Sequence, residues 1–232
     1  MNILSKCLYN IRLLLFYEFR ENKLSEIIFK EIKDILGLNL EQNITILDFG
    51  SGKQPIIIQK LIFDLNKFYK KNLFKAECFD FYTKTEIDKL NKTSNQIQFY
   101  DLKKLRYKKK YDFILVIDVL HHIGVEKKSK IISVLNLMKS HCKYLFIKDH
   151  FEYGFFSNKM LRIMDFVGNN YNDVTLPKKY FTQIEYDKLI DNIKLKEIKR
   201  ISNIRYYKKY WLFFSNPKLQ FISVLKDKNL LG

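Results

Sequence analysis

The sequence predicts an α/β fold, a doubly wound and mostly parallel sheet that ends in an antiparallel C-terminal strand pair. Short apolar runs alternate with helical patterns over residues 44–148, which is typical of consecutive βαβ units. One run, Tyr-Asp-Phe-Ile-Leu-Val-Ile-Asp at 111–118, is almost continuously apolar, as expected for a strand covered on both faces. Two later runs, at 195–201 and 219–225, favour the antiparallel pair.

The other elements are expected in order along the chain. Apolar side chains recur every three or four positions over residues 5–37, which predicts an N-terminal helix with Gly37 as its C-cap. A first strand covers 44–49, and Pro55 suits the first turn of a helix that runs to about residue 71. Further strands are expected at 76–81, 97–100 and 144–148, with helices at 85–90 and 127–140.

Length and composition fit one domain over residues 1–232, with residues 1–40 as an N-terminal helical extension. A chain of 232 residues buries a sizeable core, and a hydrophobic content of 47% argues against disorder. The three cysteines form neither a zinc-binding pattern nor a disulfide framework. The sequence therefore predicts no metal site and a reducing, cytoplasmic environment.

The net charge of +17 leaves the partner open. Basic surfaces are typical of proteins that bind nucleic acid or anionic lipid. The chain is also rich in Lys, Asn, Ile, Phe and Tyr and poor in Gly, Pro and Trp, a joint bias that an AT-rich genome imposes on any protein. This bias favours compositional drift over a dedicated nucleic-acid surface. No apolar run approaches the roughly 18 residues of a membrane span, so any membrane contact of the N-terminal helix would be peripheral.

A tight turn follows the first predicted strand, in the segment Ile-Leu-Asp-Phe-Gly-Ser-Gly at 46–52. Gly50 and Gly52 accept positive φ and let backbone N–H groups approach a ligand without a Cβ in the way. Asp48 lies near the carboxyl end of that strand, where open α/β sheets bind their ligands. The pattern predicts a nucleotide-like ligand at this edge.

Three acids, Asp48, Asp80 and Asp101, fall at the ends of successive predicted strands. A carboxylate after the second strand can accept both hydroxyls of a ribose, and one after the third can accept from an adenine amino group. Each acid alone also suits a helix N-cap or a turn. The three together favour a nucleoside-containing ligand.

These segments resemble the motifs of the class I S-adenosylmethionine-dependent methyltransferases. Leu-Asp-Phe-Gly-Ser-Gly at 47–52 is similar to their first motif, and Cys-Phe-Asp-Phe at 78–81 to their second-strand acid. Gln-Phe-Tyr-Asp-Leu at 98–102 is similar to the adenine-side motif, and residues 111–122 to the fourth-strand motif. The resemblance covers roughly residues 40–150. It implies a Rossmann-like sheet of seven strands and S-adenosylmethionine as the cofactor.

The resemblance also implies which residues hold each part of the cofactor. Asp80 and Phe81 would bind the ribose, and Asp101 and Leu102 would bind the adenine. The methionine part would lie against Asp48, Gly50, Ser51 and Gly52. Asp118 and Val119 would line the pocket around the methyl group. A dinucleotide-binding fold is the competing interpretation, but its fingerprint requires Gly or Ala where this chain has Pro55. The methyltransferase is therefore the favoured interpretation.

Two histidines are candidates for a general base, which an oxygen nucleophile would use. His150 lies at the end of the fifth predicted strand, where Asp149 would orient it toward the methyl group. His122 is the second candidate, although a structural or pocket-lining role is favoured for the pair His121-His122. Residues 151–190 follow the fifth strand, where this family often inserts acceptor-binding elements, and are expected to form a lid.

We therefore expect a methyltransferase that acts on a small-molecule, lipid-linked or saccharide-linked acceptor, in the cytoplasm or at the membrane periphery. The aromatic cluster at 206–214, interleaved with lysines, fits base stacking, a membrane interface or core packing. The charge favours a second hypothesis, an RNA-modifying methyltransferase. Against it, residues 118–121 are Asp-Val-Leu-His rather than an Asn/Asp-Pro-Pro-Tyr-like tetrapeptide. A third hypothesis is a non-catalytic binding protein that kept the fold.

Overall fold

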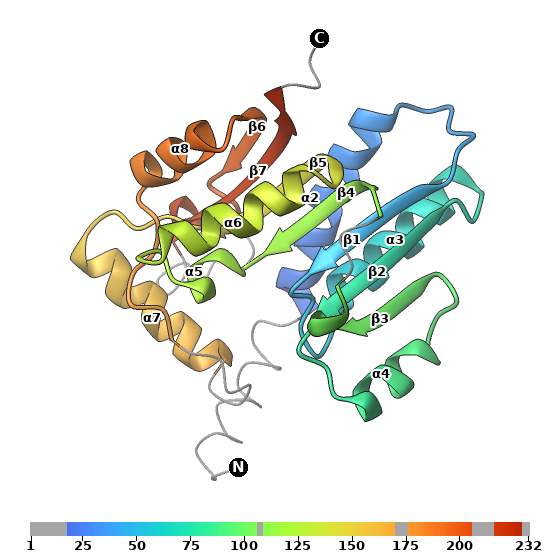
Figure 1. Ribbon diagram of the computed structural model, residues 1–232, viewed down its shortest axis with the longest axis horizontal. Helices are drawn as coiled ribbons and strands as arrows, with labels where there is room; N and C mark the ends of the chain where they lie inside the picture. The colour runs from blue at the N-terminus through green and yellow to red at the C-terminus, as the bar shows by residue number, and fades with distance from the viewer. Residues whose placement is uncertain (1–17, 106–108, 170–175, 206–215, 229–232) are drawn as a thin grey trace.

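The computed structural model describes residues 18–105, 109–169, 176–205 and 216–228 (Figure 1). The aromatic cluster at 206–214 and the first part of the predicted N-terminal helix, residues 5–17, lie outside the described residues. No helix within the described ranges is long and apolar enough to cross a membrane.

A seven-stranded sheet forms the centre of the molecule, in the order β3-β2-β1-β4-β5-β7-β6. The first five strands run parallel, and β7 is antiparallel to both β5 and β6. This topology confirms the predicted doubly wound sheet and its antiparallel ending. The strands are β1 (Ile44–Phe49), β2 (Phe74–Asp80), β3 (Ile97–Asp101), β4 (Tyr111–Ile117), β5 (Cys142–His150), β6 (Leu195–Ser202) and β7 (Gln220–Asp227).

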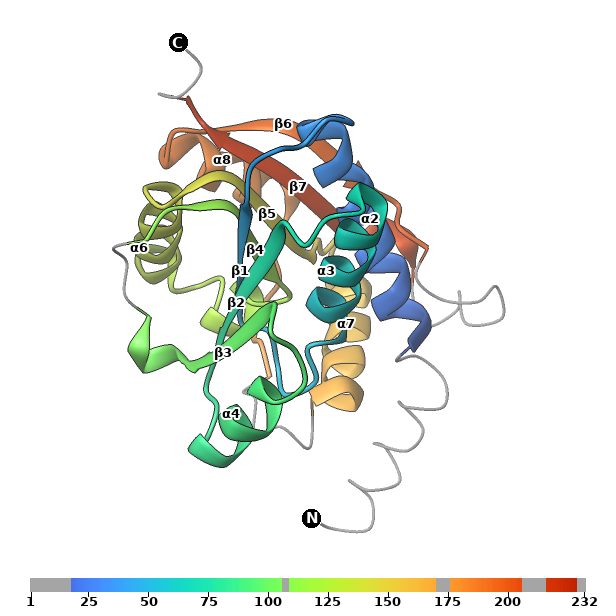
Figure 2. The same ribbon diagram turned by 90° about the vertical axis from the view of Figure 1, so that its right-hand side faces the viewer.

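Helices cover both faces of this sheet. Helices α2 and α3 lie on one face and α6 and α8 on the other, while α5 and α7 gather near the carboxyl ends of β4 and β5 (Figures 1 and 2). The helices are α2 (Glu18–Leu36), α3 (Ile56–Tyr69), α4 (Lys84–Asn91), α5 (Leu120–Ile123), α6 (Lys128–Lys139), α7 (Phe155–Asn169) and α8 (Gln183–Asn192).

Two apolar cores hold these layers together. On one face, α2 contributes the buried side chains of Leu24, Ile28 and Ile32, which recur at the spacing of one helix face. On the other face, Tyr186 of α8 packs against Phe221 of β7, with ring centroids 4.7 Å apart. Helix α2 is therefore part of the main core rather than an appendage to it.

Turn residues set the ends of the helices. Gly37, with φ +73°, donates its N–H to Lys33 O at 2.9 Å and ends α2 as predicted. Lys70 adopts a left-handed conformation, so α3 ends at Tyr69 rather than near residue 71. Thr182 and Glu185 form the capping box that begins α8.

Strand β5 is longer than its apolar pattern indicates. It continues to His150 because its last residues pair with β7, Asp149 opposite Phe221 and His150 opposite Gln220. Side chains alternate along a strand, so Lys148 and His150 lie on one face of the sheet and Asp149 on the other. Lys148 and His150 can therefore contact the same neighbours, whereas Asp149 contacts side chains on the opposite face of the sheet.

Candidate active site

The glycine turn lies at the carboxyl end of β1. Gly50 and Gly52 have φ of +76° and +71°, which favours glycine at both positions. Gly50 donates its N–H to Phe79 O at 2.8 Å, and a Cβ on Gly50 would lie 2.5 Å from Val119 Cγ2. A Cβ on Gly52 would meet nothing within 4 Å. The turn therefore packs tightly against Val119, two residues after β4, on one side and leaves bare backbone open on the other.

Asp80 joins this turn to the end of β2. Its carboxylate accepts hydrogen bonds from Gly52 N at 2.7 Å and Phe81 N at 2.6 Å. A carboxylate has about four acceptor positions, so two remain for ribose hydroxyls. Tyr82 also connects the loop after β2 to the glycine turn, because its hydroxyl donates to Gly52 O at 2.6 Å and lies 2.7 Å from Ser51 Oγ. Tyr82 was not predicted as a site residue, because one tyrosine after a strand carries no distinguishing pattern.

Asp48 lies below the turn among other carboxylates. Its side chain is buried, and burial together with the nearby charges of Asp80 and Glu21 raises its pKa to about 7. Glu21 belongs to α2 and is buried too, and its Oε2 has no hydrogen-bond partner among the described residues. Glu21 Oε1 already pairs with the Arg20 guanidinium, so Asp48 and Glu21 Oε2 are the acidic groups left to meet a cationic ligand group. Glu21 was missed because it is 27 positions before Asp48 in a segment that predicts only a packing helix.

Asp101 ends β3 directly beside Asp80, since the two residues are register partners. Its Oδ1 accepts from Lys103 N at 3.0 Å and so caps the short 3₁₀ helix Leu102–Lys104. Asp101 therefore does act as a helix N-cap, the structural role that the sequence also allowed for each of the three acids. The carboxylate remains at the same sheet edge as the glycine turn, as its predicted contact with adenine requires.

Asp118 follows β4 in a left-handed conformation, with φ +56°. Its carboxylate pairs with the Lys148 ammonium from β5 and with the Arg20 guanidinium from α2. Burial opposes the ionisation of Asp118, but these two cations outweigh it and hold the pKa of the carboxyl well below its usual range. Arg20 is another residue that the sequence analysis missed, again on α2.

Asp149 contacts a different histidine from the one expected. Its Oδ1 lies 2.6 Å from His121 Nδ1 but 3.6 Å from His150 Nδ1. The shorter contact follows from the alternation of β5, which directs Asp149 away from the face that carries His150. Burial disfavours the charged form of His121, but Asp149 and Asp165 outweigh it and raise its pKa to about 9.

His150 lies in the Lys148–Asp118 group instead. Its Nε2 is 3.4 Å from Lys148 Nζ and its Nδ1 is 3.5 Å from Asp118 Oδ1. Burial and the Lys148 ammonium lower the pKa of His150 below its usual value. In the structure His150 therefore shares its surroundings with Lys148 rather than with Asp149.

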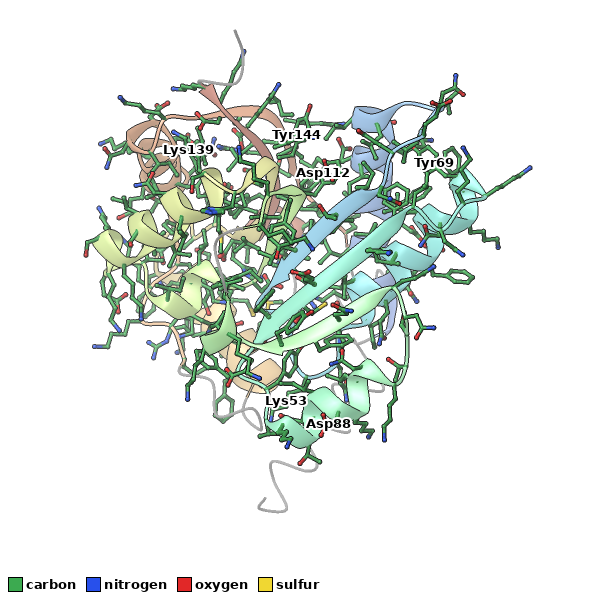
Figure 3. The ribbon with its side chains drawn as sticks, turned by 45° about the vertical axis from the view of Figure 1, so that its right-hand side comes forward. Lys53, Tyr69, Asp88, Asp112, Lys139 and Tyr144 are labelled. Carbon is green, nitrogen blue, oxygen red and sulfur yellow. The ribbon has the colours of Figure 1, made fainter. Side chains whose placement is uncertain are left out.

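The predicted residues meet at one edge of the molecule. Figure 3 shows Lys53, which follows the glycine turn, and Asp88 at the carboxyl end of the sheet, and Asp112 and Tyr144 at the opposite end. We call the strand-end acids Asp48, Asp80 and Asp101 the predicted cofactor half and the Asp118–Lys148–His150 group the predicted acceptor half. His122 lies beside His121, with ring centroids 4.1 Å apart.

A family model described as a methyltransferase domain matches residues 18–223. The chain belongs to this methyltransferase family, and the expected membership of the class I S-adenosylmethionine-dependent enzymes is confirmed. S-adenosylmethionine is the cofactor of this family. No curated protein sequence matches the chain.

Solved structures share the fold at low sequence identity. Magnesium protoporphyrin IX methyltransferase from Synechocystis PCC 6803, with bound S-adenosylhomocysteine, has a TM-score of 0.56 at 14% identity, covering 98% of this chain and 89% of that one. The 1,6-didemethyltoxoflavin-N1-methyltransferase from Burkholderia thailandensis, with bound 1,6-didemethyltoxoflavin and S-adenosylhomocysteine, has a TM-score of 0.56 at 11% identity, covering 90% of this chain and 78% of that one. Mitomycin 7-O-methyltransferase has a TM-score of 0.54 at 12% identity, covering 87% of this chain and 54% of that one.

Proposed function

We propose that this chain binds S-adenosylmethionine at the glycine turn and transfers its methyl group to a small-molecule or lipid-linked acceptor. The observation that carries the proposal is the Asp48–Glu21–Asp80 group beside a turn of open backbone. The cofactor has two cationic centres, an ammonium and a sulfonium. Buried acids with an unpaired carboxylate oxygen, Glu21 Oε2, suit the ammonium.

The bound cofactor supplies an activated methyl group, so the protein mainly has to position the acceptor in line with it. Within the proposal, Asp80 and Phe81 hold the ribose, and Asp101 and Leu102 hold the adenine. Ser51 and the two glycines lie against the methionine part, and Asp118 and Val119 flank the reacting end.

His150 is the proposed general base, with Lys148 rather than Asp149 as its close neighbour. His150 Nδ1 is buried and has no hydrogen-bond partner among the residues described. The Lys148 ammonium can only donate, so His150 Nε2 keeps its lone pair and the ring hydrogen lies on Nδ1. The proton of an acceptor hydroxyl would therefore go to Nε2. His122 stays a predicted second base.

An apolar acceptor is supported by α7. Phe155 and Phe156 at its first turn are 75% and 85% exposed, and Asp165 further along the helix lies 3.4 Å from His121. Helix α7, which lies in the predicted lid at 151–190, therefore presents apolar surface at its first turn and contacts His121 beside the acceptor half. Cytoplasmic localisation, peripheral membrane contact and an RNA acceptor stay predictions of the sequence alone.

Calorimetric titration with S-adenosylhomocysteine tests the cofactor site. We expect Asp80→Ala to weaken binding at least tenfold, because both hydrogen bonds to ribose hydroxyls are lost. Asp88→Ala is the matched control, since Asp88 is an exposed acid on the adjacent helix α4. Wild-type affinity in Asp80→Ala would contradict the ribose assignment. No binding to the wild-type protein would favour a non-catalytic protein that kept the fold.

Methyl-labelled cofactor and a fractionated cell extract test the acceptor. We expect the label to enter organic-soluble or small aqueous products, and His150→Gln to abolish transfer while leaving S-adenosylhomocysteine affinity unchanged. Label in nuclease-sensitive, acid-precipitable material would favour the RNA-modifying alternative instead.

A further inference from the structure

A second cluster of polar side chains lies beside the acceptor half, and only His122, the predicted second base, is shared with the proposed transfer. Its members are His121 and His122 of α5 and Asp165 of α7, each of which offers one ligand atom within 4.8 Å of the others. His121 is fully buried, and its Nε2 makes no hydrogen bond among the described residues. That nitrogen instead faces Asp165 Oδ2 at 3.4 Å.

We propose that His121 Nε2, His122 and Asp165 form a binding site for one divalent transition-metal ion, with Zn²⁺ as the reference ion. Two imidazoles and one carboxylate are a ligand set that such ions take, with a further position left for water or substrate.

The spacing of the donor atoms fits an ion between them. Ligand atoms that lie about 2.0–2.1 Å from a tetrahedral zinc ion are about 3.4 Å from one another. The measured separation of His121 Nε2 and Asp165 Oδ2 is 3.4 Å. The adjacent rings of His121 and His122 have centroids 4.1 Å apart, so the second imidazole lies beside the first.

His121 and Asp165 each make a further hydrogen bond to a neighbouring side chain, of the kind that orients metal ligands in proteins. Asp149 Oδ1 holds the other ring nitrogen of His121 at 2.6 Å, which directs Nε2 toward Asp165. The Tyr180 hydroxyl donates to Asp165 Oδ2 at 2.5 Å and so fixes the carboxylate. Both outer groups are polar side chains of buried residues, Asp149 and Tyr180.

A neighbouring group of possible ligands is less suitable. It consists of Asp118, His121, Asp149 and His150. The Lys148 ammonium and the Arg20 guanidinium already pair with the Asp118 carboxylate. An ion there would meet two fixed positive charges, whereas the His121–His122–Asp165 cluster has the carboxylates of Asp149 and Asp165 around one imidazole.

Titration of the tag-free, chelator-treated full chain with ZnCl₂, in the absence of S-adenosylmethionine, tests the site. We expect one equivalent of Zn²⁺ to bind, and Asp165→Ala and His122→Ala each to weaken binding at least tenfold. His141→Ala is the matched control, because His141 follows the C-terminal end of α6, directly before β5, and is not part of the cluster. Its affinity should equal that of the wild type.

Two outcomes would overturn the proposal: no stoichiometric Zn²⁺ binding by the wild-type chain, or binding that Asp165→Ala leaves unchanged. Circular dichroism of each metal-free variant separates lost ligands from lost folding, and His122 and Asp165 are chosen because neither is fully buried. S-adenosylhomocysteine affinity is measured on the same samples, so failure of the metal site and failure of the cofactor site are distinguishable.

Discussion

At the scale of single residues, Asp48 combines burial with two acidic neighbours. An isolated aspartate ionises near 3.8, whereas burial, Asp80 and Glu21 raise the pKa of Asp48 to about 7 in the folded chain. The folded state therefore holds a proton that the unfolded state releases. Folding is favoured by this proton below pH 4, and the advantage is lost as the pH rises from 4 to 7.

Replacing Asp48 by Asn removes this pH dependence. We expect Asp48→Asn to be more stable than the wild type at pH 8, by a few kcal/mol, on the order of the three-unit shift. At pH 4.5 the difference should largely disappear, because the wild-type carboxyl is then protonated. Urea unfolding at both pH values measures it, with Asp88→Asn as the exposed control. A larger gain at pH 4.5 than at pH 8 would contradict the assignment.

At the scale of elements, the start of α4 fixes the loop that follows Asp80 and carries Phe81. Thr83 and Glu86 form a capping box, in which Thr83 N donates to Glu86 Oε2 at 2.8 Å. Glu86 also pairs with Lys53 at 3.3 Å, just after the glycine turn. The cap therefore connects the helix to both loops of the cofactor half.

Removing this cap should destabilise the protein modestly. We expect Thr83→Ala to lower the free energy of unfolding by about 1 kcal/mol, because the N-terminal N–H groups of α4 lose their acceptor. Thr85→Ala is the matched control: Thr85 is exposed in the first turn, where alanine is tolerated. Denaturant midpoints report both changes, and equal effects of the two variants would argue against the cap.

At the scale of the whole molecule, stability rests on the two cores on either side of the sheet. Phe146 in the middle of β5 is 1% exposed and packs against Phe113 of β4, with ring centroids 6.0 Å apart. Parallel strands between two helical layers bury such side chains completely.

Truncation in this core should cost far more than truncation at the surface. We expect Phe146→Ala to reduce the free energy of unfolding by about 3–5 kcal/mol, since a large cavity replaces the ring. Phe63→Ala on α3 is the control, because Phe63 is 63% exposed. A similar loss in both variants, in equilibrium unfolding, would show that Phe146 is not in a packed core.

The sequence was sufficient for the features that local patterns determine. The alternation of strands and helices was enough to predict the doubly wound sheet with its antiparallel ending, and the turn at Gly50 and Gly52 follows from residue type. Long-range contacts leave no such pattern: nothing near Glu21 indicates that it reaches Asp48. The contact between Asp149 and His121 could not be predicted from the sequence either, because it depends on how far β5 continues when it pairs with β7.

The first turn of α2 places two adjacent residues in the two halves of the site. Glu21 adds its charge to the buried acids around Asp48, and Arg20 pairs with Asp118. Under the proposed function this helical turn borders both ligand sites. Arg20 and Glu21 also pair with each other, so a shift that changes one contact changes the other. Cofactor and acceptor affinities would then be coupled through this turn, and thermodynamic reciprocity requires each ligand to change the affinity of the other by the same factor.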